Sequence, residues 1–224
     1  MTLRIVCISD THQLESDLVV PPGDVLIHAG DFTFFGKGIK AIANFNTWLG
    51  ELPHTHKIVT CGNHELAIES DPTLRHLITN GTLLLNESVM VGPAKIWGSP
   101  LTPHSGAFGR SNAAERVNVY DSIPADTDIL VTHGPPYGIL DSSPAEQAGP
   151  SGDRELRQAV LRVRPRLHVF GHVHAGYGVR QTRHTVFVNA ALFGPNGSLE
   201  NCPIVLEMST FKDHGYNIKG ESDE

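Results

Sequence analysis

Five short apolar runs, each ending in aspartate, asparagine or histidine, constrain the fold of this chain more than any other feature. The runs cover residues 3–8, 25–29, 57–61, 128–132 and 167–170. Runs of β-branched and aliphatic residues are typical of strands covered on both faces. In an open α/β sheet, ligands bind outside the carboxyl ends of such strands. The polar residues that follow the runs are Asp10, His12, Asp31, Asn63, His64, His133, His172 and His174.

Nitrogen and oxygen side chains at neighbouring strand ends are suitable ligands for a metal ion. Each segment also has a simpler interpretation, because an aspartate after a strand often caps a helix or closes a turn. The segment Gly62-Asn63-His64-Glu65, for example, is equally consistent with a plain asparagine turn. Five such segments in one chain, each preceded by an apolar run, favour a metal site over five unrelated turns.

The residues around two of these segments limit where the histidines lie. His133 is followed by Gly134-Pro135-Pro136, which cannot continue a strand or begin a helix, so we expect His133 at a strand terminus. If residues 171–174 form an extended turn, the side chains of His172 and His174 point the same way. That arrangement suits one metal or two neighbouring metals.

The rest of the sequence predicts further helices and strands. Apolar spacing and capping residues indicate helices over residues 39–49, 111–120 and 153–163. Residues 82–98 predict two or three short strands with a hairpin turn at Gly92-Pro93, which we interpret as the antiparallel start of a second sheet. Strands over 185–189 and 203–208 follow.

These elements predict an α/β fold class. Strands and helices alternate first and further strands follow, which favours a four-layer α/β/β/α sandwich with two mixed β-sheets. We expect one domain over residues 1–211 and a frayed polar tail over 212–224.

Charge and composition exclude several function classes. The 224 residues carry a net charge of −7 with histidine neutral, which argues against binding to nucleic acid or an anionic membrane. The sequence has no run of 18 apolar residues, and a first strand at Leu3 leaves no room for a signal peptide. Cys7, Cys61 and Cys202 are too scattered for a disulfide framework. We therefore expect a cytoplasmic protein.

The five segments together resemble the motif of the calcineurin-like metallophosphoesterase superfamily. That motif runs D-x-H, G-D, G-N-H-[DE], a lone H and G-H-x-H, and the chain matches it from residue 10 to residue 174. All blocks of the motif are present, which makes the match specific.

A narrower resemblance covers nearly the whole chain. It is to the metallophosphoesterase-domain-containing branch known from animal brain, which is similar to class III cyclic-nucleotide phosphodiesterases. Some members of that branch replace the first histidine of G-H-x-H by glycine, whereas this chain keeps His172. The segments that carry the resemblance are Trp97-Gly98-Ser99-Pro100, Thr132-His133-Gly134-Pro135-Pro136, residues 164–171 and Asn189-Ala190.

The resemblance implies a role for each site residue. His64 binds no metal; it hydrogen-bonds the phosphate and protonates the leaving oxygen. The catalytic residues are therefore expected to be His64, Asp31 and Asn63. The implied metal ligands are Asp10, His12 and His174 for one ion, Asn63, His133 and His172 for the other, and Asp31 as the bridge between them.

Two divalent metal ions per chain are the expected cofactors. Histidine, asparagine and carboxylate ligands without thiolate suit Mn²⁺, Fe or Zn²⁺ better than Ca²⁺, and the resemblance favours Mn²⁺. Such a pair lowers the pKa of a bridging water, and the resulting hydroxide attacks phosphorus in line. The ions also neutralise the phosphoryl oxygens as negative charge shifts.

The expected enzyme is a metal-dependent phosphoric ester hydrolase. The narrow resemblance implies a phosphodiesterase for small phosphodiesters such as cyclic nucleotides. A nuclease or a phosphomonoesterase could use the same site, and a non-catalytic scaffold could retain the fold alone. The acidic balance argues against the nuclease, and the complete ligand set argues against the scaffold.

The expected partner is a small phosphodiester or nucleotide substrate, with no membrane and no stable nucleic-acid complex. Several aromatic side chains fall in loops near the predicted site, where they could stack a base. The alternative for each is ordinary loop packing. These residues are Phe32, Phe34, Phe35, His104 and Tyr137.

Overall fold

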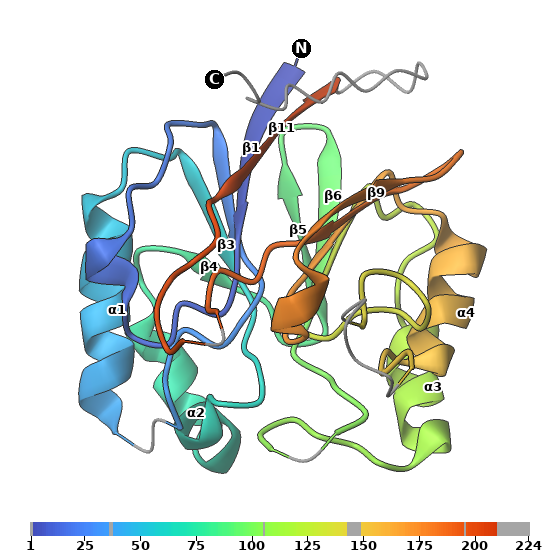
Figure 1. The fold of residues 1–224 in the computed structure, drawn as a ribbon, viewed down its shortest axis with the longest axis horizontal. Helices are drawn as coiled ribbons and strands as arrows, with labels where there is room; N and C mark the ends of the chain where they lie inside the picture. Colours follow the sequence, from blue (N-terminus) through green and yellow to red (C-terminus); the bar gives the residue numbers. More distant parts are fainter. Residues whose placement is uncertain (1, 36–37, 105, 143–148, 195, 210–224) are drawn as a thin grey trace.

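Two β-sheets lie face to face in the computed structural model, with helices on both outer sides (Figure 1). The structure describes residues 2–35, 38–104, 106–142, 149–194 and 196–209. The first sheet has the order β11-β1-β2-β3-β4, and the second has the order β5-β6-β7-β8-β10-β9. The predicted sandwich with two mixed sheets is therefore confirmed.

The strands of each sheet are as follows. The first sheet contains β1 (Thr2–Ile8), β2 (Val25–His28), β3 (His56–Val59), β4 (Thr82–Leu83) and β11 (Ile204–Ser209). The second contains β5 (Glu87–Val91), β6 (Ala94–Ser99), β7 (Ile129–Thr132), β8 (Leu167–Phe170), β9 (Gly178–Gln181) and β10 (Val186–Asn189). Strands β1 to β4 run parallel, and so do β6, β7, β8 and β10.

The segment at 82–98 divides between the two sheets, which corrects part of our prediction. Strands β5 and β6 form the expected antiparallel hairpin around Gly92. Strand β4 instead pairs in parallel with β3 in the first sheet. The reason is packing, because Leu83 is buried in the apolar cluster beneath the first helix. The antiparallel start of the second sheet is thus confirmed only from Glu87 onward.

Three apolar clusters separate the four layers. One lies between the sheets and contains residues of both, such as Ile27 and Val131. A second joins the first sheet to α1 (Ile39–Glu51) and α2 (Leu66–Ser70). The third joins the second sheet to α3 (Ala113–Asp121) and α4 (Arg154–Val163). Figure 1 shows α1 and α2 on one side of the sandwich and α3 and α4 on the other.

Capping side chains set where α3 and α4 begin. Asn112 caps α3 by accepting a hydrogen bond from the amide of Ala114. Asp153 caps α4 by accepting from the amides of Glu155 and Leu156. Both helices therefore start one or two residues later than the sequence pattern alone indicates, with the capping residue outside the helix. Short 3-10 turns cover Glu15–Asp17, Pro72–Leu77 and His174–Gly176.

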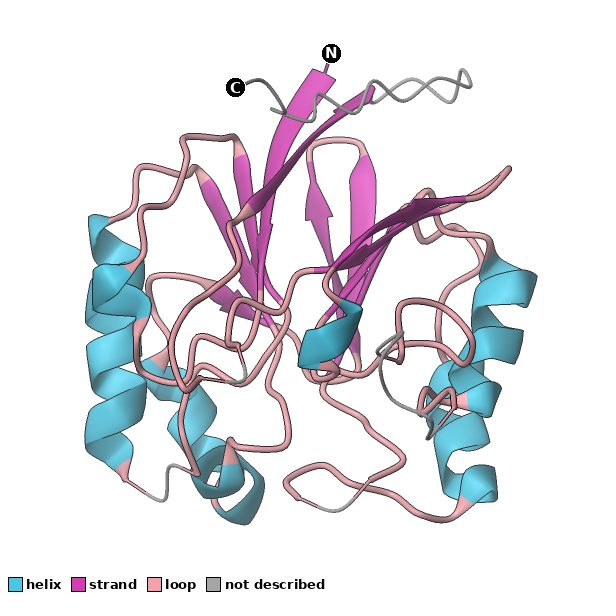
Figure 2. Ribbon diagram, in the orientation of Figure 1, coloured by secondary structure: helices cyan, strands magenta, loops and turns pink. Residues whose placement is uncertain are grey.

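Loops gather at one end of the sandwich, as Figure 2 shows. The two sheets are joined at this end, because Ser9 after β1 pairs with Ala191 after β10. The amide of Leu192 also donates to the Ser9 carbonyl oxygen at 2.9 Å. The carboxyl ends of strands from both sheets are thereby brought together.

Two further predictions concern the chain as a whole. The predicted tail over 212–224 lies outside the described residues, and the single domain over 1–211 stays a prediction. Within the described part of the chain, every helix is too short or too polar to cross a membrane.

Candidate metal centre

Each polar residue predicted from the strand ends lies at the joined end of the sandwich. The residues after β1, β2 and β3 face those after β7 and β8 across the space between the sheets. Among the described residues, three groups have ligand atoms within 4.8 Å of one another. The groups are Asp10 with His12 and His174, His12 with Asp31 and His64, and Asp31 with His133 and His172.

The first group combines residues from both sheets. Nε2 of His174 lies 3.2 Å from Oδ1 of Asp10. The His12 ring donates through Nδ1 to the Thr33 carbonyl oxygen at 3.2 Å, which leaves its Nε2 with a free lone pair. Asp10 also accepts from the His172 amide, so the loop after β8 is fixed against the loop after β1.

The third group, together with Asn63, places the lone pairs of His133 and Asp31 close to one another. Nδ1 of His133 donates to the Ala29 carbonyl oxygen at 2.9 Å, so in the neutral ring Nε2 carries only a lone pair. That Nε2 lies 2.9 Å from Oδ1 of Asn63 and 3.4 Å from Oδ2 of Asp31. Nδ1 of His172 approaches the same asparagine oxygen at 2.8 Å. The lone pairs of His133 Nε2 and Asp31 and the amide oxygen of Asn63 converge, so this donor set fits a metal ion.

The charges of the site support the same conclusion. Burial raises the pKa of Asp10 and Asp31, but the neighbouring histidines outweigh burial and lower both pKa values below the ordinary range. Burial lowers the pKa of His133, but Asp31 outweighs it and raises that pKa to about 9. Without a metal, a proton on His133 serves as the cation. With a metal, the same lone pair is available for coordination.

The backbone at the site is held in an uncommon conformation. Asp10, His12, Asp31 and His172 all have φ between 47° and 67°, in the left-handed region. Uncommon backbone conformations of this kind at functional sites persist because the surrounding structure holds them in place. Our prediction of an extended turn over residues 171–174 is wrong, because His172 is left-handed and a 3-10 turn begins at His174. The two histidines consequently belong to different ligand groups.

Two glycines are required because the site leaves no room for a side chain. A Cβ atom on Gly62 would lie 2.3 Å from Oδ1 of Asp31 and 2.5 Å from Cε1 of His133. A Cβ atom on Gly171 would lie 2.1 Å from Oδ2 of Asp10. The glycines therefore allow two strand ends to approach the buried carboxylates.

His64 differs from the other histidines in how its ring is held. Its Nδ1 accepts a hydrogen bond from the Phe35 amide at 3.1 Å. The neutral ring therefore carries its proton on Nε2, which is directed toward the site. Nε2 lies 3.7 Å from Oδ2 of Asp31, which is beyond hydrogen-bonding distance. This N–H is available to donate to a bound substrate.

Glu65 is a site residue to which the sequence analysis gave no role. Its buried carboxylate accepts from the amides of Asp31 at 3.0 Å, Thr33 at 2.8 Å and Gly62 at 2.5 Å. It also accepts from the Thr33 hydroxyl at 3.0 Å. Glu65 thus fixes the loop after β2 against the loop after β3, and it holds Asp31 in its left-handed conformation.

We expect Glu65→Gln to destabilise the protein and weaken metal binding. Whichever oxygen becomes the NH₂ group, two donors lose their acceptor, and each hydrogen bond to a charged group contributes about 1.5–3 kcal/mol. Thermal unfolding and metal titration would measure both effects. Glu115→Gln, at an exposed position in the first turn of α3, is the matched control. An unchanged melting temperature would show that Glu65 does not hold the two loops together.

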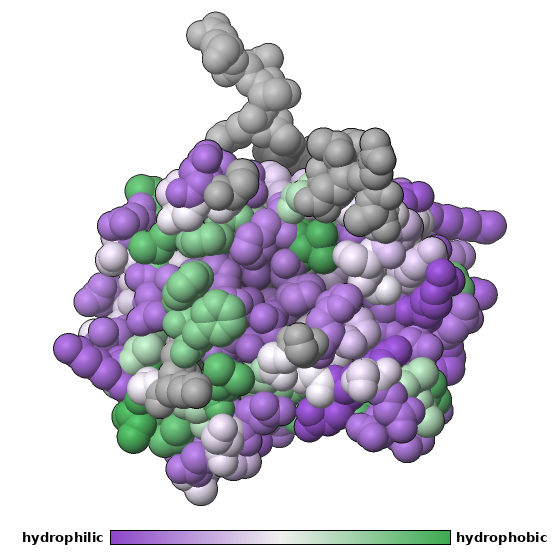
Figure 3. All heavy atoms as spheres, turned by 60° about the horizontal axis from the view of Figure 1, so that its bottom comes forward, coloured by the Kyte–Doolittle hydropathy of each residue, from purple (hydrophilic) through white to green (hydrophobic). Residues whose placement is uncertain are grey.

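The aromatic residues proposed to stack a base fall into three groups. Phe32 is fully buried and stacks on Phe45 with ring centroids 4.2 Å apart, so of the two alternatives for Phe32 packing is the one observed. Phe34 and Phe35 are 51% and 59% exposed and lie beside His64. His104 and Tyr137 lie on the opposite side of the site, near His172. Viewed from the loop end, the surface is hydrophilic at its centre with hydrophobic residues beside it (Figure 3).

Neither buried thiol is arranged as a nucleophile. Burial raises the pKa of Cys61, with Glu65 and Asp31 adding to the effect, and burial also raises the pKa of Cys7. A protonated thiol is a poor nucleophile, so any attacking group must come from elsewhere.

A sandwich whose strand ends bring histidines and carboxylates together in this way defines a metallophosphoesterase-like protein. The model of the calcineurin-like phosphoesterase family matches residues 3–176, and the chain belongs to that family. The match covers every residue of the three ligand groups.

Two relatives agree with this assignment, and a solved structure shares the fold. Metallophosphoesterase domain-containing protein 1 of Homo sapiens is 37% identical, covering 92% of this chain and 71% of the human protein. A UPF0046 protein of Caenorhabditis elegans is also 37% identical, covering 91% and 74% of the two chains. The crystal structure of TT1561 of Thermus thermophilus has a TM-score of 0.59 at 13% identity, covering 84% and 89%. That likeness shows the fold alone.

Proposed function

We propose that this protein is a phosphodiesterase for small phosphodiesters, such as cyclic nucleotides, that depends on two divalent metal ions. The observation that carries the proposal is the position of Asp31. Its carboxylate belongs to ligand groups on both sides of the site, as a residue shared by two cations would. The ordered surroundings of the carboxylate, with Glu65 behind it, support a fixed bridging role.

The residues divide naturally between two ions. Asp10, His12 and His174 would hold one, and Asn63, His133 and His172 would hold the other. When bound, such a pair supplies a water of lowered pKa and charge neutralisation for the phosphoryl oxygens. Mn²⁺ is our choice for activity, with Fe and Zn²⁺ also suited to this donor set.

The chain's own contribution is to position the phosphate. The His64 Nε2–H is free to donate to a phosphoryl oxygen, because Nδ1 is occupied by the Phe35 amide. A donor placed in advance at the point where negative charge develops stabilises the transition state without reorganising. The rings of Phe34 and Phe35 flank this histidine.

The other parts of the proposal follow from charge and redox chemistry. A net charge of −7 argues for a small substrate as partner and against a stable complex with nucleic acid or a membrane. Cys7 and Cys61 are free buried thiols, in keeping with a reducing compartment such as the cytoplasm.

We expect the protein to bind about two divalent ions per chain, as two-metal phosphoesterases do. Protein stripped with chelator should lose activity and melt at a lower temperature, because ligands that bind only the folded state stabilise it. Titration with Mn²⁺, followed by metal analysis, should restore both. Full activity at one equivalent would rule out the two-metal arrangement.

A substrate panel tests the reaction itself. We expect Mn²⁺-loaded protein to hydrolyse cyclic nucleotides and bis(p-nitrophenyl) phosphate faster than phosphomonoesters or single-stranded DNA. Faster hydrolysis of a monoester would favour a phosphomonoesterase, and faster hydrolysis of DNA a nuclease. Metal binding without hydrolysis of any substrate would favour a scaffold.

A further inference from the structure

A hollow of about 340 Å³ lies beside the metal centre, between the loop before α3, the turn after β7 and the start of α4. Its lining includes His104, Tyr137 and Arg154. The His104 ring stacks on that of His172, with centroids 5.3 Å apart and planes 19° apart. Nε2 of His104 donates to the Ser151 carbonyl oxygen at 3.1 Å. A single ring therefore separates the hollow from a predicted metal ligand.

Hydrogen bonds fix the walls of this hollow against each other. The Asp141 carboxylate accepts from the amides of Gly138 at 2.8 Å and Gly152 at 2.9 Å. The Tyr137 amide donates to the Asp153 carbonyl oxygen at 3.0 Å, and the Asp153 amide donates back to Pro135 at 2.9 Å. These hydrogen bonds hold residues 135–141 against residues 152–153 along one wall of the hollow.

The charged groups lining the hollow cancel. Arg116 forms ion pairs with Asp153 at 3.0 Å and Glu155 at 2.6 Å. The Tyr120 hydroxyl also donates to Asp153 at 2.9 Å. With Arg154, the lining carries two positive and two negative side chains, a formal sum of zero. A hollow of this kind does not favour an anion such as a second phosphate.

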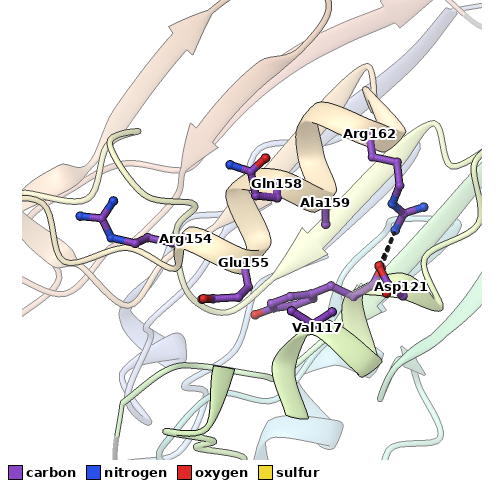
Figure 4. A pocket seen from close by; sticks show the side chains of 8 residues that line it. Val117, Asp121, Arg154, Glu155, Gln158, Ala159 and Arg162 are labelled. Carbon is purple, nitrogen blue, oxygen red and sulfur yellow. Dashed lines mark hydrogen bonds and ion pairs between the residues drawn. The ribbon is translucent and has the colours of Figure 1, made fainter. Parts of the chain in front are cut away.

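Arg154 is the charged residue of this lining that remains open to a ligand. Its guanidinium carbon lies 3.7 Å from the centroid of the Tyr137 ring. Among the described residues, no carboxylate lies within ion-pair distance of it, and the side chain is exposed. Figure 4 shows Arg154 extending from the start of α4 on the side away from Arg162 and Asp121. A guanidinium stacked on a ring keeps its N–H donors directed outward.

We propose that this hollow binds the nucleobase of the substrate, an inference that rests on the phosphodiesterase function proposed above. His104 and the Tyr137–Arg154 pair offer flat surfaces on which a base can stack. The outward N–H groups of Arg154 match the ring-nitrogen and carbonyl acceptors of a base edge. A base is planar and uncharged, which agrees with the cancelled charges of the lining.

The test compares two substrates on Mn²⁺-loaded protein, a cyclic nucleotide and the cyclic phosphate of a methyl riboside, which has no base. Arg154→Ala should lower kcat/KM about tenfold or more on the cyclic nucleotide and leave the base-free substrate within twofold. Tyr137→Leu should act in the same way. Arg157→Ala, one turn further along α4 and outside the lining, is the matched control and should change neither value.

Several results would overturn the inference. Equal losses on both substrates, or no loss on either, would mean that the hollow does not bind the base. If the wild-type protein hydrolyses neither cyclic phosphate, the proposed function fails. Equilibrium binding of a nucleoside to the wild-type protein and to Arg154→Ala then tests whether the hollow binds a base. Equal affinities of the two proteins would overturn the inference.

Discussion

Asp31→Asn should lower kcat by about 10³-fold or more, because the metals supply several kcal/mol of transition-state stabilisation. The side chain belongs to ligand groups on both sides of the site. Its Oδ2 lies 3.4 Å from Nε2 of His133, and its Oδ1 accepts from the His64 amide at 2.9 Å. An amide in this position offers one neutral oxygen in place of two anionic ones, so both ions lose an anionic ligand at once.

His172→Ala provides the comparison, since it removes one neutral ligand from one ion. Loss of a residue that hydrogen-bonds a metal ligand lowers metal affinity by about 10–100-fold. We expect loss of the ligand itself to lower the affinity by at least that much. Excess Mn²⁺ should restore part of the activity by mass action. Asp121→Asn, at an exposed carboxylate on α3, controls for the change of charge. If added metal rescues Asp31→Asn as fully as His172→Ala, Asp31 does not bridge.

The positions of the site residues could be predicted because they follow from strand ends. Short apolar runs rich in β-branched residues are typical of buried strands, and the residue after such a strand lies at the edge of the sheet. Asp10, Asp31 and His133 are therefore located by the runs before them. The structure also fixes details that periodicity cannot, such as the left-handed conformation of His172. That conformation depends on the Asp10 carboxylate, which accepts from the His172 amide.

Other features could not be predicted because they depend on tertiary contacts. The sequence does not show which amides donate to Glu65, since two of them lie more than 30 residues away along the chain. His28 is the last residue of β2 and resembles a core residue, yet it links Thr11 to the Gly30 amide. Phe32 is a loop aromatic residue that turns inward because Phe45 offers a stacking partner. Polar edge strands such as β9 also lack the apolar alternation that would reveal them.

The sequence resemblance gave His64 two tasks, to hydrogen-bond the phosphate and to protonate the leaving oxygen. The geometry favours the first. A general acid must carry a proton that it can release, which for this ring means protonation of both nitrogens. Protonated Nδ1 would face the Phe35 N–H, which donates to it at 3.1 Å. Two N–H groups directed at each other repel, so the neutral ring with its proton on Nε2 is the favoured form.

His64→Ala should therefore lower kcat by about 10²–10³-fold, the usual cost of removing one donor to a developing negative charge. The loss should be the same on a cyclic nucleotide and on bis(p-nitrophenyl) phosphate, because a phosphoryl oxygen needs the donor in both. A general acid would matter only for the cyclic nucleotide, whose alkoxide leaves poorly, and not for nitrophenolate, which leaves readily as an anion. His76→Ala, at an exposed position remote from the site, is the control. Metal content must stay unchanged, since loss of an ion would make His64 a ligand. A loss confined to the cyclic nucleotide would restore the general-acid role and require the Phe35 hydrogen bond to break during the reaction.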